Sequence, residues 1–149
     1  MTTTEQLPLS LLFERDETAW LETMARLSAE GRFAEMDRFN LSEYLADMAK
    51  RDRREVFSRL VLLLSHLLKW EQQPERRTPS WNGTIVEQRR ELRKLLESGT
   101  LHNHADAVFA EAYDDARRQA AADTGLPRDT FPADCGWELE SLMVDESED

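Results

Sequence analysis

Three histidines and one cysteine are the side chains in this sequence whose types could support metal binding or nucleophilic catalysis. His102, His104 and Asp106 lie close together, as metal ligands often do. On a helix, however, residues two apart point about 200° away from each other, so His102 and His104 cannot share a metal ion unless that turn is unwound. A bundle-type di-iron site needs a Glu three residues before a His on two helices. The three positions in question hold Leu63, Gly99 and Leu101. We therefore expect no metal site.

The single cysteine, Cys135, lies between Asp134 and Gly136, with no histidine nearby in the sequence. A reactive thiolate needs a base or a cation beside it, whereas a free buried cysteine behaves as a small hydrophobic side chain. We favour the second interpretation. The five glycines stand singly, so they cannot form a phosphate-binding loop. The sequence therefore predicts no catalytic residue and no cofactor.

Arg59 and Lys69 bracket the most apolar run of the chain, and His66 is the ionisable side chain between them. An unpaired buried polar group costs about 1–3 kcal/mol, so a buried imidazole needs a partner. Gln88, a polar residue on the inner stripe of the following helix, is the candidate. A neutral histidine that locks helix packing is the favoured interpretation, because buried polar groups are normally hydrogen-bonded. The alternative is a polar pocket that serves a site, made of His66, Lys69, Gln88 and Arg89.

Two tryptophans, Trp70 and Trp81, flank one loop that also contains Arg76 and Arg77. Aromatic and cationic side chains together could stack a base or hold an anion at a surface edge. The simpler interpretation, which we favour, is that both indoles close the end of the hydrophobic core. These four residues are the candidate surface edge.

The elements that must position these residues are all helices. Residues 56–70 are apolar on nearly every side, which predicts a core helix covered all round by others, and this run is too short to span a membrane. Apolar stripes with a 3.6-residue period predict helices over residues 11–30, 41–72, 79–97 and 101–123, with a short last helix over 136–143. The helix over 41–72 either runs on, continuous or gently kinked, which we favour, or breaks near Arg51 with Asp52 as a new cap. The fold class is therefore all-α, a compact bundle of about five main helices plus a short C-terminal one.

Capping signals set the expected ends of these helices. Asn40 followed by Glu43 indicates a capping box, Thr78 before Pro79 indicates a start, and Thr100 can cap the next helix. Gly125 is typical of a helix end. We expect one domain over residues 1–149, with an ordered core from about 11 to 143 and frayed termini.

The charges are unevenly distributed along the chain. The net charge of −11 argues against general affinity for nucleic acid or anionic membranes. Residues 50–94 carry a net +6, however, and the remainder carries −17. Either acidic and basic helices pair within the monomer, which we favour, or a partner recognises one of the two regions. The N-terminus lacks a secretory signal pattern, so we expect a cytoplasmic protein.

Several short motifs occur in a characteristic order: LLLSHLLKW from Leu62, SW at Ser80, QR at Gln88, AYDDAR from Ala112, TGLP from Thr124 and FP at Phe131. With these motifs the chain resembles, from about Leu11 to Met143, the bacterial family known as domain of unknown function twenty-nine. Relatives often have glycine near Ala49 and proline at the position of Gly136. The resemblance implies an all-helical bacterial protein. It carries no assigned reaction, so it transfers no catalytic residue.

The function we expect is that of a non-enzymatic cytosolic protein-interaction module. Its partner would be an unidentified protein or a second copy in a weak homodimer, because Leu11, Leu12 and Leu21 lie off the main stripe of the first helix. One alternative is an enzyme of unrecognised type that uses the polar pocket around His66. The other is an antitoxin-like regulator of a basic or nucleic-acid-binding partner.

Overall fold

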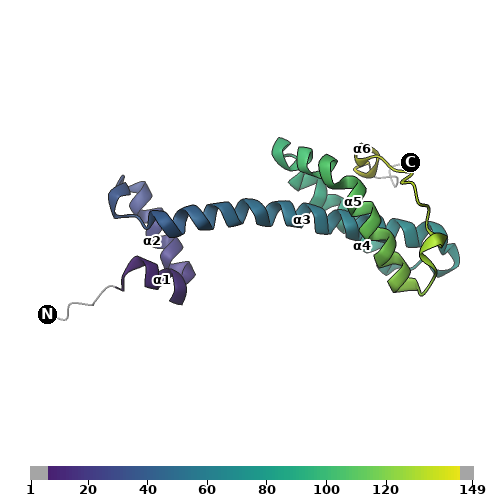
Figure 1. Ribbon diagram of the computed structural model, residues 1–149, viewed down its shortest axis with the longest axis horizontal. Helices are drawn as coiled ribbons and strands as arrows, with labels where there is room; N and C mark the ends of the chain where they lie inside the picture. Colours follow the sequence, from purple (N-terminus) through teal and green to yellow (C-terminus); the bar gives the residue numbers. More distant parts are fainter. Residues whose placement is uncertain (1–6, 145–149) are drawn as a thin grey trace. The chain divides into compact units, whose positions relative to one another are not determined.

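The computed structural model describes residues 7–144, and Figure 1 shows the order of the helices along the chain. The α-helices are α1 (Leu9–Arg15), α2 (Glu17–Ala29), α3 (Arg38–Gln72), α4 (Pro79–Leu95), α5 (Gly99–Thr124) and α6 (Leu139–Leu142). Three short 3₁₀ turns connect them: η1 (Phe33–Glu35), η2 (Pro74–Arg76) and η3 (Arg128–Thr130). No strand occurs within residues 7–144. The all-α prediction of five main helices and a short C-terminal one is confirmed. The expected frayed ends fall largely on residues 1–6 and 145–149, outside the described part.

The chain divides between Lys50 and Arg51 into two compact units. Each unit has its own cluster of buried apolar side chains, one built around Trp20 and the other around the apolar part of α3. The expectation of one domain over residues 1–149 stays a prediction.

In the first unit, the buried face of α2 is made by Trp20, Met24 and Leu27, which recur at helical spacing as the sequence predicts. The Trp20 ring meets Phe13 edge-on, with 4.7 Å between ring centroids. The predicted continuous helix from residue 11 is wrong, because the chain breaks at Asp16. The Asp16 side chain accepts a hydrogen bond from the Ala19 amide at 3.1 Å and so caps α2.

Two further expectations about this unit need correction. Leu12 and Leu21, expected on an exposed apolar side, are partly buried against the Trp20 cluster. Conversely, Leu45 lies with Leu41, Tyr44 and Met48 on the stripe that the sequence predicts as the buried face of the helix over 41–72, yet it is 59% exposed.

The start of α3 lies earlier than the sequence suggests. The prediction that Asn40 is the N-cap is wrong, because Asp37 takes that role. The Asp37 carboxylate accepts hydrogen bonds from the Asn40 backbone amide at 3.4 Å and from its side-chain amide at 2.7 Å. From Arg38 the helix continues without a break to Gln72, which confirms the continuous interpretation. Residues 49–54, in the polar middle of this helix, are all exposed.

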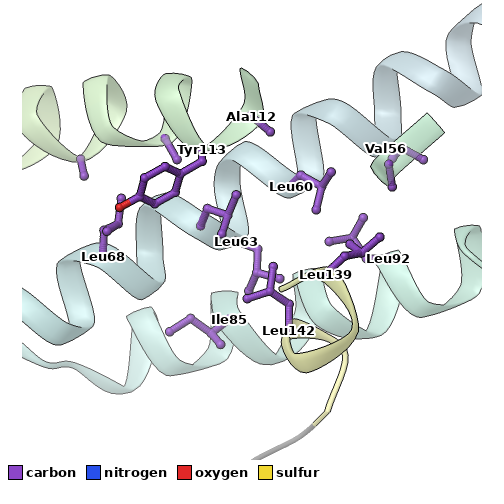
Figure 2. Packing of buried hydrophobic residues seen from close by; sticks show 14 of the residues in the cluster. Val56, Leu60, Leu63, Leu68, Ile85, Leu92, Ala112, Tyr113, Leu139 and Leu142 are labelled. Atoms are coloured by element: carbon purple, nitrogen blue, oxygen red, sulfur yellow. The ribbon is translucent and has the colours of Figure 1, made fainter. Parts of the chain in front are cut away.

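In the second unit, the apolar part of α3 is the central element. Figure 2 shows Leu60 and Leu63 of α3 among side chains from α4, α5 and α6. Close approach of α5 follows from its small residues, since four of its alanines are fully buried: Ala105, Ala112, Ala116 and Ala120. The expectation that α3 is covered all round is wrong. Phe57, Val61 and Leu62 are only half-buried, and their open side faces away from this core.

The ends of α4 and α5 follow local signals. Thr78 caps α4 as predicted, accepting from the Trp81 amide at 3.1 Å. Ser98, and not Thr100, caps α5, since its hydroxyl accepts from the Leu101 amide at 3.3 Å. Gly125 ends α5 with φ +72°, the left-handed conformation that glycine adopts without a steric penalty.

After α5 the chain returns across the second unit as an irregular segment anchored by the fully buried Phe131. Backbone carbonyls of this segment accept hydrogen bonds from buried or half-buried side chains. Arg89 Nε donates to Leu142 O at 2.6 Å, and Arg117 Nη2 donates to Phe131 O at 3.1 Å. The last helix is shorter than predicted, and Glu138 caps it.

Candidate functional site

The structure places His66 on α3, half-buried, with its Nδ1 3.0 Å from the Leu62 carbonyl oxygen one turn earlier. Gln88 does not pair with it, so that expectation is wrong. The Gln88 side-chain oxygen instead accepts from Arg59 Nη1 at 3.0 Å. The reason is helix register: α3 and α4 run antiparallel from the short connection around η2, and Gln88 lies farther from that connection than His66 does. Burial lowers the pKa of His66.

Lys69 is buried at the meeting point of three helices. Its Nζ lies 3.1 Å from Asp123 Oδ2 on α5 and 5.4 Å from the centre of the Trp81 ring on α4. The four residues of the predicted polar pocket form different hydrogen bonds, since Arg89 holds the C-terminal segment and Gln88 holds Arg59, while His66 and Lys69 interact through the charge of Lys69. The structure does not join them through the hydrogen bonds and ion pairs described, and their role in a site stays a prediction.

The predicted surface edge is assembled only in part. The Arg77 guanidinium stacks on the Trp70 ring at 4.7 Å, and its Nε donates to the Trp70 carbonyl at 2.8 Å. Trp81 instead faces Lys69, and Arg76 is exposed in η2. Each indole is half-buried, as expected of rings that close the end of a core. A ligand-binding role for the edge stays a prediction.

A groove lies between α3 and α5 in the second unit, and the sequence analysis missed it. Its volume is about 380 Å³. One wall comes from α3 and the other from α5. The lining residues are Phe57, Ser58, Val61, Leu62, Asp115, Gln119 and Asp123. The signal was present in the sequence, because Asp115, Gln119 and Asp123 recur every four residues and therefore share one face of a helix.

The two walls differ in chemistry. The α3 wall is apolar apart from Ser58, whereas the α5 wall carries two carboxylates. Burial raises the pKa of Asp123, but hydrogen bonds from Gln119 and Lys69 outweigh it, and the pKa is lowered overall. Asp115 lies 3.3 Å from Arg118, a solvent-exposed ion pair. The groove is therefore an apolar floor edged by two carboxylates, of which Asp123 pairs with the buried Lys69 and Asp115 with the exposed Arg118.

A smaller hollow of about 130 Å³ lies under the C-terminal segment, between Leu68, Tyr113 and Trp137. The Tyr113 hydroxyl there donates to the Pro132 carbonyl, and burial raises the pKa of the phenol. Burial likewise raises the pKa of Cys135, whose Sγ lies 3.3 Å from the Trp137 carbonyl oxygen. The raised pKa disfavours the ionised, more nucleophilic form of each group.

Within residues 7–144, no group of three or more histidine, cysteine or acidic side chains is placed to hold a metal ion. None of the helices in the same range has the length and apolar character needed to cross a membrane.

The described residues thus form an all-helical protein with an open groove in its second unit. The chain belongs to the family described as domain of unknown function DUF29, whose model matches residues 12–147. The resemblance found in the sequence motifs is thereby confirmed. The search of curated proteins and the search of solved structures both found no match.

Proposed function

We propose that this protein is a non-enzymatic protein-interaction module of the bacterial cytosol, and that it binds its partner through the α3–α5 groove. The observation that carries the proposal is the apolar wall of that groove. Phe57, Val61 and Leu62 lie in the most apolar stretch of the chain, yet all three keep part of their surface in contact with water. Covering such surface stabilises a complex by about 25 cal/mol per Å² of apolar area.

The groove is supported by a rigid frame. Phe57 and Val61 pack with their inner sides against the core of the second unit, and buried alanines hold α5 close to that core. An interface on such a frame needs little ordering when a partner binds, which lowers the entropic cost of association.

The alternative of an enzyme has weaker support. The polar side chains that it would use are engaged in holding helices together: Lys69 with Asp123, Gln88 with Arg59, and Arg89 with the Leu142 carbonyl. The sequence has one cysteine and so no pair for an internal disulfide, which suits a reducing compartment and supports the cytosolic location.

The test is affinity capture of the full chain from a native lysate with two matched variants. Val61→Arg places a charge in the groove, and Val86→Arg places the same charge on α4, where Val86 is 39% exposed. We expect wild type and Val86→Arg to retain one stoichiometric protein partner and Val61→Arg to lose it. A partner retained equally by all three, or a co-purifying small molecule without a protein, would contradict the proposal.

A further inference from the structure

We infer that the occupant of the α3–α5 groove is a basic amphipathic helix of the partner protein, a conclusion that rests on the proposed function above. Its apolar side chains would lie on Phe57, Val61 and Leu62. Its lysine or arginine side chains would reach the carboxylate of Asp115.

The shape of the groove favours a helix. Residues on each wall recur at intervals of four, as Phe57 and Val61 do on α3 and as Asp115, Gln119 and Asp123 do on α5. Eight residues of α-helix correspond to about 12 Å, so the α5 wall extends for roughly two turns. A trough between two helices accepts a third helix through anchors at positions i, i+3, i+4 and i+7. A volume of about 380 Å³ has room for a few such side chains.

The charge of the groove favours a basic occupant. Asp115 is engaged only in an exposed ion pair with Arg118, a type of pair worth about 0–1 kcal/mol, so an incoming cation can replace that partner at small cost. Glu111 and Asp114, both exposed on α5, add further negative charge beside it. Long basic side chains can cover apolar surface with their stems while their charged ends reach a carboxylate.

The same charge argues against a second copy of this chain. A symmetric dimer through this groove would place one patch against itself. Because the lining of the groove contains no lysine or arginine, a second copy would bring no cation to the groove carboxylates. Complementary charge is supplied instead by a basic partner.

The experiment uses two synthetic helical peptides and the full-length protein. Both peptides carry leucine at positions i, i+3, i+4 and i+7, and their flanking positions are all lysine in one and all glutamate in the other. We expect saturable one-to-one binding of the lysine peptide, measured by fluorescence anisotropy, and no binding of the glutamate peptide. Val61→Arg should abolish binding of the lysine peptide, and Val86→Arg should leave it unchanged.

A matched pair of charge variants tests the role of the groove carboxylate. Asp115→Asn should weaken binding of the lysine peptide about three- to tenfold, whereas Asp114→Asn, on the same helix outside the groove lining, should change it less than about twofold. Circular dichroism of each variant confirms that it is folded.

Three results would overturn the inference. Equal binding of the two peptides would show that charge does not select the occupant. Equal weakening by Asp114→Asn and Asp115→Asn would show general attraction to an acidic protein. Sedimentation showing a wild-type dimer that Val61→Arg dissociates would assign the groove to a second copy. If the lysine peptide fails while capture still depends on Val61, the interaction module stands and only the chemistry of its partner is wrong.

Discussion

His66 couples the stability of the second unit to pH. Burial has the largest effect and lowers the pKa of His66, and the charge of Lys69 lowers it further. The contact with the Leu62 carbonyl and the charge of Asp123 raise this pKa, but the net result is a lowered pKa. The unfolded chain, with a histidine pKa of about 6.5, therefore takes up this proton first as pH falls. The stabilising contribution is fully present above about pH 6.5 and is lost as pH decreases below that value.

We expect the melting temperature of the wild type to fall more steeply than that of His66→Gln between about pH 7.5 and pH 5.5. The control is His104→Gln, which removes a histidine from a different helix, α5. If His66 instead belongs to a binding site, His66→Gln should abolish partner capture with the melting temperature nearly intact. Identical pH profiles for wild type and His66→Gln would rule out the packing role.

Lys69 is the residue through which α3, α4 and α5 are joined by charge, since it pairs with Asp123 and faces Trp81. Lys69→Met keeps the length of the side chain but removes its charge. Because the Asp123 side chain is 35% exposed, its carboxylate remains hydrated in the variant. We therefore expect a loss of about 1–3 kcal/mol of unfolding free energy in urea denaturation.

The matched control for that measurement is Lys94→Met, because Lys94 pairs with Glu91 at 3.3 Å but is 65% exposed. An exposed pair of this type contributes about 0–1 kcal/mol. Equal losses in the two variants would show that the buried position of Lys69 has no energetic consequence.

For single residues, the sequence predicts helix caps and helix ends better than it predicts the hydrogen-bond partner of a buried side chain. The cap at Thr78 and the helix end at Gly125 are predictable because both depend on neighbours within a few residues. The partner of His66 is not, because it depends on the register between α3 and α4, which a hydrophobic pattern does not specify. The i−4 carbonyl of the same helix then provides the closest acceptor.

At the scale of the element, α5 shows how small side chains allow one helix to pack closely against the others. Its buried alanines leave no room beside the core, whereas Ala110 on the same helix is exposed. We expect Ala116→Leu to reduce the unfolding free energy by about 1–3 kcal/mol through overpacking. Chemical denaturation should show Ala110→Leu within about 0.5 kcal/mol of wild type. A neutral Ala116→Leu would mean that α5 does not approach the core closely.

The helices themselves are largely predictable, since the apolar stripes identify α2, α3, α4 and α5. The errors lie where two polar residues compete for one cap. Asp37 and Asn40 both have side chains suited to an N-cap, as do Ser98 and Thr100, and in each case the earlier residue takes the role. The break at Asp16 was missed because the apolar stripe continues across it from Phe13 to Trp20.

At the scale of the whole molecule, the groove could not be predicted because an apolar helix does not reveal which part of its surface is covered. Leu62 and Leu63 are neighbours of equal hydrophobicity, yet Leu63 is fully buried and Leu62 lines the groove. The uneven charge distribution anticipated a contact between basic and acidic segments, and Lys69 with Asp123 is such a contact. Of the two carboxylates that line the groove, Asp115 differs from Asp123 because its ion-pair partner, Arg118, is exposed to solvent.

The most direct test of the account is to identify what lies in the groove in the cell. A photoreactive amino acid at Ser58, which lines the groove, reports on its occupant, and the same amino acid at Glu87, exposed on α4, serves as the control. We predict one defined protein adduct from Ser58, crosslinked within a basic amphipathic helix, and none from Glu87. No adduct from Ser58, or the same set of adducts from both positions, would contradict the assignment of the groove as the binding surface.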